Sequence, residues 1–268
     1  PHTQRPSYPF KDQLLAWAGK PSIWPLTVGS ASLTLLTGFL LCLSPYNPST
    51  KLILGLLAVG ITSSFWLHDL LSESCWEGYT TRFLSSCIRY GIALFILSEV
   101  SLFASLLSTF FYSALVPDVS MGGVWPPYFI QAVNPWGVPF LNTLILLFSG
   151  VMVTYSHHLL KRGNKFPSLI SLILTIILAL VFLTFQLWEY YNTVFTLNDS
   201  TFGSIFFIST GCHGCHVFIG MILLLSQALR FHLSLWNHHI FYELAIWYWH
   251  FVDVVWLFLF VLVYWWSS

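Results

Sequence analysis

Apolar residues run along this chain in long stretches that are separated by polar segments. Seven stretches can be distinguished, at about 26–43, 52–67, 89–113, 138–156, 168–189, 203–229 and 241–266. A helix needs about 20 apolar residues to cross a bilayer, whereas a barrel strand needs about 10 and alternates apolar with polar positions. Because these stretches are too long for barrel strands and do not alternate, they predict an all-α polytopic membrane protein with seven transmembrane helices.

Composition supports a membrane protein. Of 268 residues, 56% are hydrophobic and only 7% are charged, whereas a soluble domain carries about 25% charged residues. The 10 basic residues balance the 10 acidic ones, so no basic surface is available and nucleic acid is not an expected partner. Five cysteines, an odd number, do not indicate a disulfide framework.

The basic residues are distributed unevenly between the two sides that seven spans define. One side holds an N-terminal extramembrane segment, 1–25, and loops at about 68–88, 157–167 and 230–240. Nine of the ten basic residues belong to this side: Arg5, Lys11, Lys20, Arg82, Arg89, Lys161, Arg162, Lys165 and Arg230. Since Lys and Arg concentrate in loops on one face of a membrane, the N-terminus is expected on the positive side and the C-terminus on the other.

Five ionisable residues from three predicted helices lie near the middle of their spans. They are Glu99, His213, His216, His250 and Asp253. Charge inside a membrane is costly, so such residues are candidates for function. Two interpretations stay open: a proton relay, ligand site or ion path, or carboxylates and imidazoles that satisfy one another between packed helices.

The segment 212–216 reads Cys-His-Gly-Cys-His, which has the spacing of a c-type haem attachment site. Covalent haem at Cys212 and Cys215 is not expected, because the motif lies well inside an apolar stretch and attachment requires an exposed segment. His213 and His216 share a helix face, which suits a metal, but only His250 offers a partner on another span. We therefore predict no metal site, no haem and no catalytic residue in this chain.

The loop that precedes the third stretch carries an acidic stripe, Asp69, Glu73 and Glu77, and two basic residues, Arg82 and Arg89. Lipid headgroups or a partner subunit could bind there. The alternative is a solvated loop with local ion pairs.

The C-terminal segment 246–260, IWYWHFVDVVWLFLF, closely resembles subunit III of the haem–copper cytochrome c oxidases. Further matches follow in the family's order, at 21–25, 89–91, 98–100, 125–127, 139–143, 155–158, 189–191, 195–196, 203–207, 210–217 and 264–266. The chain departs from the family at 68–75, which lacks two basic residues, at Gln227, where relatives often have arginine, and at Cys212 and Cys215.

The resemblance implies a cofactor-free accessory subunit of respiratory complex IV. Its main partner would be subunit I, which holds haem a and copper, within a complex that oxidises cytochrome c, reduces oxygen and pumps protons. The helices would form two groups, one to two at about 26–67 and three to seven at about 89–266, with a V-shaped lipid-filled cleft between them.

The resemblance also suggests roles for individual residues. Glu99 corresponds to the family's buried glutamate in the third helix. Structural phospholipids are expected ligands, and the residues that could bind their headgroups are Glu73, Arg89, Arg230 and His232.

The low charge and short extramembrane portions favour the mitochondrial inner membrane, with the N-terminus in the matrix and the C-terminus in the intermembrane space. The alternative is a bacterial plasma membrane. The alternative functions are a seven-helix transporter or receptor and a membrane cytochrome. A retinal receptor needs a lysine in its last helix, which the stretch 241–266 lacks. A transporter is expected to contain internal repeats, which are not found.

Overall fold

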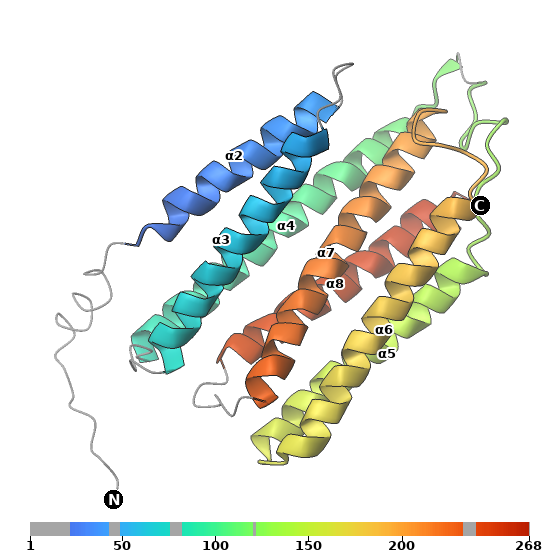
Figure 1. The fold of residues 1–268 in the computed structure, drawn as a ribbon. Coiled ribbons are helices and arrows are strands. Elements are labelled where there is room, and N and C mark those ends of the chain that lie inside the picture. Colours follow the sequence, from blue (N-terminus) through green and yellow to red (C-terminus); the bar gives the residue numbers. More distant parts are fainter. Residues whose placement is uncertain (1–21, 43–48, 76–81, 120–121, 233–239, 268) are drawn as a thin grey trace, which may run out of the picture. The chain divides into compact units, whose positions relative to one another are not determined.

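The computed structural model describes residues 22–42, 49–75, 82–119, 122–232 and 240–267. These ranges contain seven α-helices and no strand (Figure 1). The helices are α2 (Trp24–Cys42), α3 (Ser49–Cys75), α4 (Arg82–Leu115), α5 (Val138–Lys161), α6 (Lys165–Asn192), α7 (Thr201–His232) and α8 (Ile240–Leu259), which continues as the π-helix η2 (Phe260–Trp265). The predicted all-α class and the number of helices are confirmed.

Several helices extend past the apolar stretches that predicted them. Much of the expected loop at 68–88 is helical, because α3 continues to Cys75 and α4 begins at Arg82. Hydropathy marks only the part of a helix that lies in hydrocarbon, whereas backbone hydrogen bonds can carry the helix on into the interface. The N-terminal segment also ends earlier than expected, since α2 begins at Trp24, and residues 1–21 lie outside the described ranges.

Among the described helices, six are long and apolar enough to cross a membrane. The exception is α3, in which the apolar part is limited to Thr50–Trp66. This agrees with the weak signal of the second stretch.

The chain divides into two compact units, Pro1–Cys87 and Ile88–Ser268. The first unit contains α2 and α3, and the second contains α5 to α8 and nearly all of α4.

Glycines allow α2 and α3 to approach each other closely within the first unit. A Cβ atom added to Gly55 on α3 would lie 2.5 Å from the Cα atom of Leu35 on α2. A Cβ added to Gly38 on α2 would lie 2.8 Å from the backbone nitrogen of Leu52 on α3. Small residues at such positions are a common basis of helix packing in membranes.

In the second unit, α5 to α8 form a closed arrangement in which α5 contacts α6, α6 contacts α7, α7 contacts α8 and α8 contacts α5. Aromatic side chains of α8 fill much of its interior. Three of them donate a hydrogen bond to a hydroxyl on α5: Tyr242 to Ser156 at 2.7 Å, Trp249 to Ser149 at 3.0 Å and Trp256 to Thr143 at 3.0 Å. The donors are spaced by two helical turns, so they lie on one face of α8 and hold the two helices in register.

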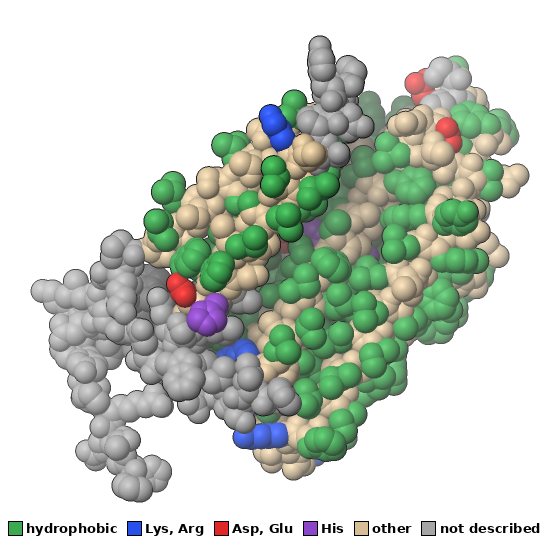
Figure 2. Space-filling model, viewed as in Figure 1, with side chains coloured by type: hydrophobic (Ala, Val, Ile, Leu, Met, Phe, Trp, Pro, Cys, Tyr) green, Lys and Arg blue, Asp and Glu red, His purple; other side chains and the backbone are tan. Residues whose placement is uncertain are grey.

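The basic residues of the second unit gather at one end of its helices. Arg89 at the start of α4 forms an ion pair of 2.9 Å with Glu243 at the start of α8. Lys161, Arg162 and Lys165 lie at the turn between α5 and α6. Figure 2 shows hydrophobic side chains over the visible sides of α6 and α7 and basic side chains near the ends of the helices. This is the pattern of a membrane-embedded bundle.

Candidate functional site

The structure brings together two of the five mid-span residues, Glu99 on α4 and His216 on α7. Their side chains meet at 2.8 Å between Oε2 of Glu99 and Nε2 of His216. Only 21% of the Glu99 side chain and 12% of the His216 side chain are exposed. The rings of Phe103 and Phe251 lie edge-on to the imidazole, at 5.1 and 6.3 Å. The pair is therefore largely enclosed by aromatic side chains.

The hydrogen bonds of His216 limit where its protons lie. Nδ1 is 2.7 Å from the backbone carbonyl oxygen of Cys212, which can only accept, so Nδ1 carries a hydrogen. A second proton must then lie between Nε2 and the carboxyl oxygen of Glu99, since two acceptors do not bond. Whichever group holds it, the pair as a whole is electrically neutral. A neutral pair is far less costly at mid-membrane depth than a lone charge.

A second pair, His250 and Asp253, lies on another face of α8. The imidazole Nε2 is 3.1 Å from Oγ1 of Thr154 on α5, and Nδ1 is 3.8 Å from Oδ2 of Asp253. The hydroxyl of Thr154 donates to the carbonyl of Gly150, so it accepts from Nε2. The carboxyl lies close against α5, because a Cβ atom at Gly150 would approach Oδ2 to 2.5 Å.

His213 is fully buried and separate from both pairs. Its ring lies 5.1 Å from that of Trp256 and 5.8 Å from that of Phe182. Neither ring nitrogen has a hydrogen-bond partner within the described residues. The five residues thus occupy three places. His216 contacts α8 at Phe251, about 200° around the helix from Asp253 at 100° per residue.

The described histidines of α7 and α8 are not arranged as a haem or metal site. Such a ligand needs a ring nitrogen that is free to face the metal. Both nitrogens of His216 are engaged, Nε2 of His250 is engaged, and aromatic rings pack against His213. Among the described residues, no group of three or more His, Cys, Asp or Glu could hold a metal ion. Cys212 and Cys215 are free thiols on α7.

Two of the candidates for lipid binding have protein partners. Arg89 is paired with Glu243, and 46% of its side chain is exposed. Arg230 is buried, donates from Nη1 to Gln227 at 3.1 Å and stacks over the ring of Phe241 at 5.3 Å. The side chains of Glu73 and His232 lie outside the described parts of the structure, as does Glu77.

Glu189 is a buried carboxyl group that the sequence did not predict. The residue is 4% exposed, and its Oε1 accepts hydrogen bonds from Tyr264 at 2.7 Å and Gln186 at 3.4 Å. It lies near the end of an apolar stretch, a position that is normally in contact with water. Its only signal in the sequence was its place in segment 189–191, which resembles the family.

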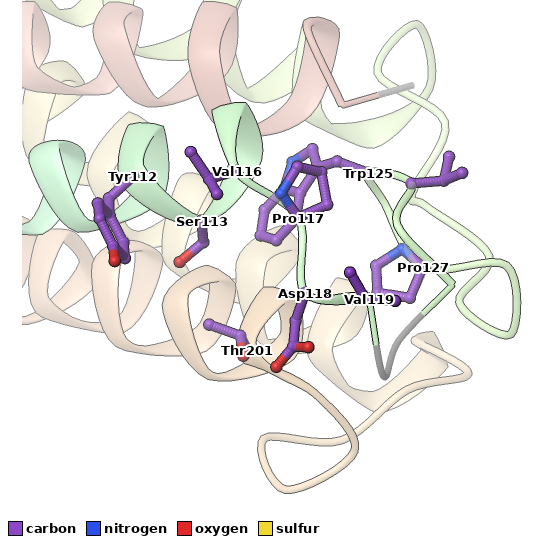
Figure 3. A pocket seen from close by; sticks show the side chains of 10 residues that line it. Tyr112, Ser113, Val116, Pro117, Asp118, Val119, Trp125, Pro127 and Thr201 are labelled. Atoms are coloured by element: carbon purple, nitrogen blue, oxygen red, sulfur yellow. The ribbon is translucent and has the colours of Figure 1, made fainter.

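A pocket of about 520 Å³ lies where α4 ends and α7 begins. Figure 3 shows Tyr112 and Ser113 of α4, Asp118, Trp125 and Thr201 around it. It is at the end of the second unit away from the basic residues. Apart from Trp125, which lies in the segment 125–127 that resembles the family, the sequence predicts no role for these side chains.

Comparison with known proteins relates the whole chain to one family. The family described as cytochrome c oxidase subunit III matches residues 18–268. A protein named cytochrome c oxidase subunit 3 from Tachyglossus aculeatus aculeatus is 47% identical over 251 residues, which cover 92% of this chain and 95% of the relative. A protein of the same name from Arabidopsis thaliana is 44% identical over 269 residues, which cover 99% and 98%. The chain therefore belongs to the cytochrome c oxidase subunit III family, as its motifs predict.

Proposed function

We propose that this chain is a structural subunit that supports subunit I of cytochrome c oxidase from within the membrane and carries no redox centre itself. The family match over residues 18–268 carries the proposal, since members of this family are subunits of complex IV. The engaged or enclosed histidines of α7 and α8 support it further. Haem a and copper then belong to the partner subunits.

The supporting role has a physical basis in the helix bundle. Aromatic N–H and O–H groups of α8 donate hydrogen bonds to hydroxyl groups of α5. Glu99 and His216 form a neutral hydrogen-bonded pair between α4 and α7. Polar groups that are paired in this way stabilise helix contacts in a membrane, where water cannot replace a missing partner. We expect this rigid subunit to protect the oxidase from inactivation during turnover and to sustain proton uptake on its N-terminal side.

We place the chain in the mitochondrial inner membrane, with the N-terminus, including segment 1–25, on the matrix side and the C-terminus on the intermembrane side. The clustering of basic residues at one end of the second unit supports this orientation. The alternative location is a bacterial plasma membrane.

Structural phospholipids are the proposed ligands. Headgroups would bind at the basic end, where Arg89, Arg230, Glu73 and His232 are the candidates. Because Arg89 and Arg230 already have protein partners, we expect them to share their donors between these partners and a phosphate.

Purification in a mild detergent tests the proposed function. The chain should comigrate with a complex that contains haem a, and its selective removal should shorten the catalytic lifetime of the remaining oxidase without changing the haem spectra. Isolation of the chain as an active protein without haem would refute the proposal and favour a free-standing transporter.

A further inference from the structure

A groove of about 670 Å³ lies on the surface of the second unit between α5 and α8. Its rim is apolar and exposed, as at Val151 on α5, which is 62% exposed, and at Val254 on α8, which is 51% exposed. Asp253 and Gly150 also line it. The carboxyl oxygen Oδ2 of Asp253 packs against Gly150 at the floor of the groove, in space that a side chain at this position would fill.

Asp253 is 7% exposed and has no hydrogen-bond donor for its carboxyl group within the described residues. Oδ1 is buried without a partner. Oδ2 faces Nδ1 of His250 at 3.8 Å, which is within ion-pair range but too long for a hydrogen bond. A buried polar group without a partner is costly, so its environment in the assembled protein is expected to supply one.

The depth of Asp253 restricts what could supply this partner. The residue lies midway along the span Ile240–Trp265, about 18–20 Å from each end at 1.5 Å per residue. Lipid headgroups are about 15 Å from the middle of the bilayer, and acyl chains cannot donate hydrogen bonds. The backbone of a neighbouring helix is already bonded to itself, so the donor must be a side chain.

We propose that this groove is the docking surface for a transmembrane helix of another oxidase subunit, and that this helix presents a hydrogen-bond-donating side chain to Asp253 at mid-membrane depth. The exposed valines on the rim supply the apolar contacts of such a helix, and the carboxyl group determines its depth. This inference rests on the proposed function, because it requires neighbouring subunits.

A density map of the intact, haem a-containing complex tests the proposal directly. We expect a helix of a different chain in the groove, with a side-chain nitrogen or oxygen within about 3.5 Å of a carboxyl oxygen of Asp253. An acyl chain, water alone or a second copy of this chain in the groove would overturn it. In those cases the proposed function still stands, whereas absence of this chain from any haem a complex would instead refute the proposed function.

Variants give a second test, in which the amount of this chain that stays with the purified complex is measured against detergent concentration. Asp253→Leu removes the acceptor, and we expect it to weaken retention by roughly tenfold. Asp253→Asn keeps the shape and an acceptor oxygen and should retain most of the association. Val151→Trp fills the groove from its rim without touching the bundle interior, and should also weaken retention.

The control for Val151→Trp is Ile177→Trp, at a position on α6 that is 49% exposed and does not line the groove. This control should leave retention unchanged. Wild-type retention of Val151→Trp, or an equal loss in both tryptophan variants, would show that the groove does not hold a subunit.

Discussion

Replacement of Glu99 by glutamine and by alanine separates its hydrogen bond from its charge. In the wild type, a proton lies between Glu99 and Nε2 of His216, because Nδ1 already donates to Cys212. A glutamine at this position can donate its amide hydrogen to Nε2, so the contact survives with both groups neutral. An alanine leaves Nε2 without a partner.

The expected magnitudes follow from the burial of the pair. Loss of a partner from a buried hydrogen bond costs about 1–3 kcal/mol. The residual exposure of the Glu99 and His216 side chains, 21% and 12%, lets water compensate in part, so we expect about 1–2 kcal/mol for Glu99→Ala. Glu99→Gln keeps one neutral hydrogen bond and should cost less than about 1 kcal/mol.

The assay is the loss of this subunit from the purified oxidase as detergent concentration or temperature increases, with haem spectra recorded in parallel. Catalytic lifetime and proton pumping are then measured on the complexes that remain intact. The control is Ser101→Ala on the same helix, because the hydroxyl of Ser101 bonds only to Leu97 of its own helix and faces outward. This change should fall within about 0.5 kcal/mol of the wild type.

Glu99→Gln should leave the haem spectra intact and alter catalytic lifetime or pumping only modestly. If glutamine destabilises the subunit as much as alanine does, a neutral hydrogen bond at this position is not sufficient to hold the pair together. Abolished oxygen reduction in an assembled Glu99→Gln complex would mean that the residue takes part in the reaction, contrary to the supporting role.

Three further predictions concern packing, and each can be measured as a change in the stability of the purified complex. Gly55→Leu should separate α2 from α3, since even a Cβ atom there would lie 2.5 Å from Leu35, and a cost of about 1–3 kcal/mol or more is expected. Tyr264→Phe removes a donor from buried Glu189 and should cost about 1–3 kcal/mol. Leu224→Ala removes a fully buried side chain and should cost about 2–5 kcal/mol, and wild-type stability of this variant would contradict the packing of α7.

Much of the fold could be predicted because it depends on local properties of the chain. Apolar length alone predicts each of the seven helices, and the family motifs predict the family. The ends of the helices were predicted less well. The helix α3 passes the end of its apolar stretch at residue 67 and continues to Cys75, because helical hydrogen bonding does not stop where hydrophobicity does.

The candidate site was predicted as a set of residues but not as an arrangement. Depth along a helix can be counted from the sequence, so Glu99, His213 and Asp253 could be named as candidates near the middle of their helices. Their separation into three places depends on the rotation of each helix about its axis, which the sequence pattern does not reveal. The same holds for Arg89, whose partner Glu243 is 154 residues away in the chain.

By itself, the sequence determined that the protein is helical and lies in a membrane, and it predicted that nine of its ten basic residues share one side, because hydropathy and charge act residue by residue. Only the tertiary structure decided which polar groups meet. It pairs Glu99 of α4 with His216 of α7 as a neutral unit and places the buried Asp253 beneath an outer groove. The physical reason is that a buried polar group is stabilised or left unsatisfied by the helix faces that pack against it, and those faces are chosen by the packing of the whole bundle.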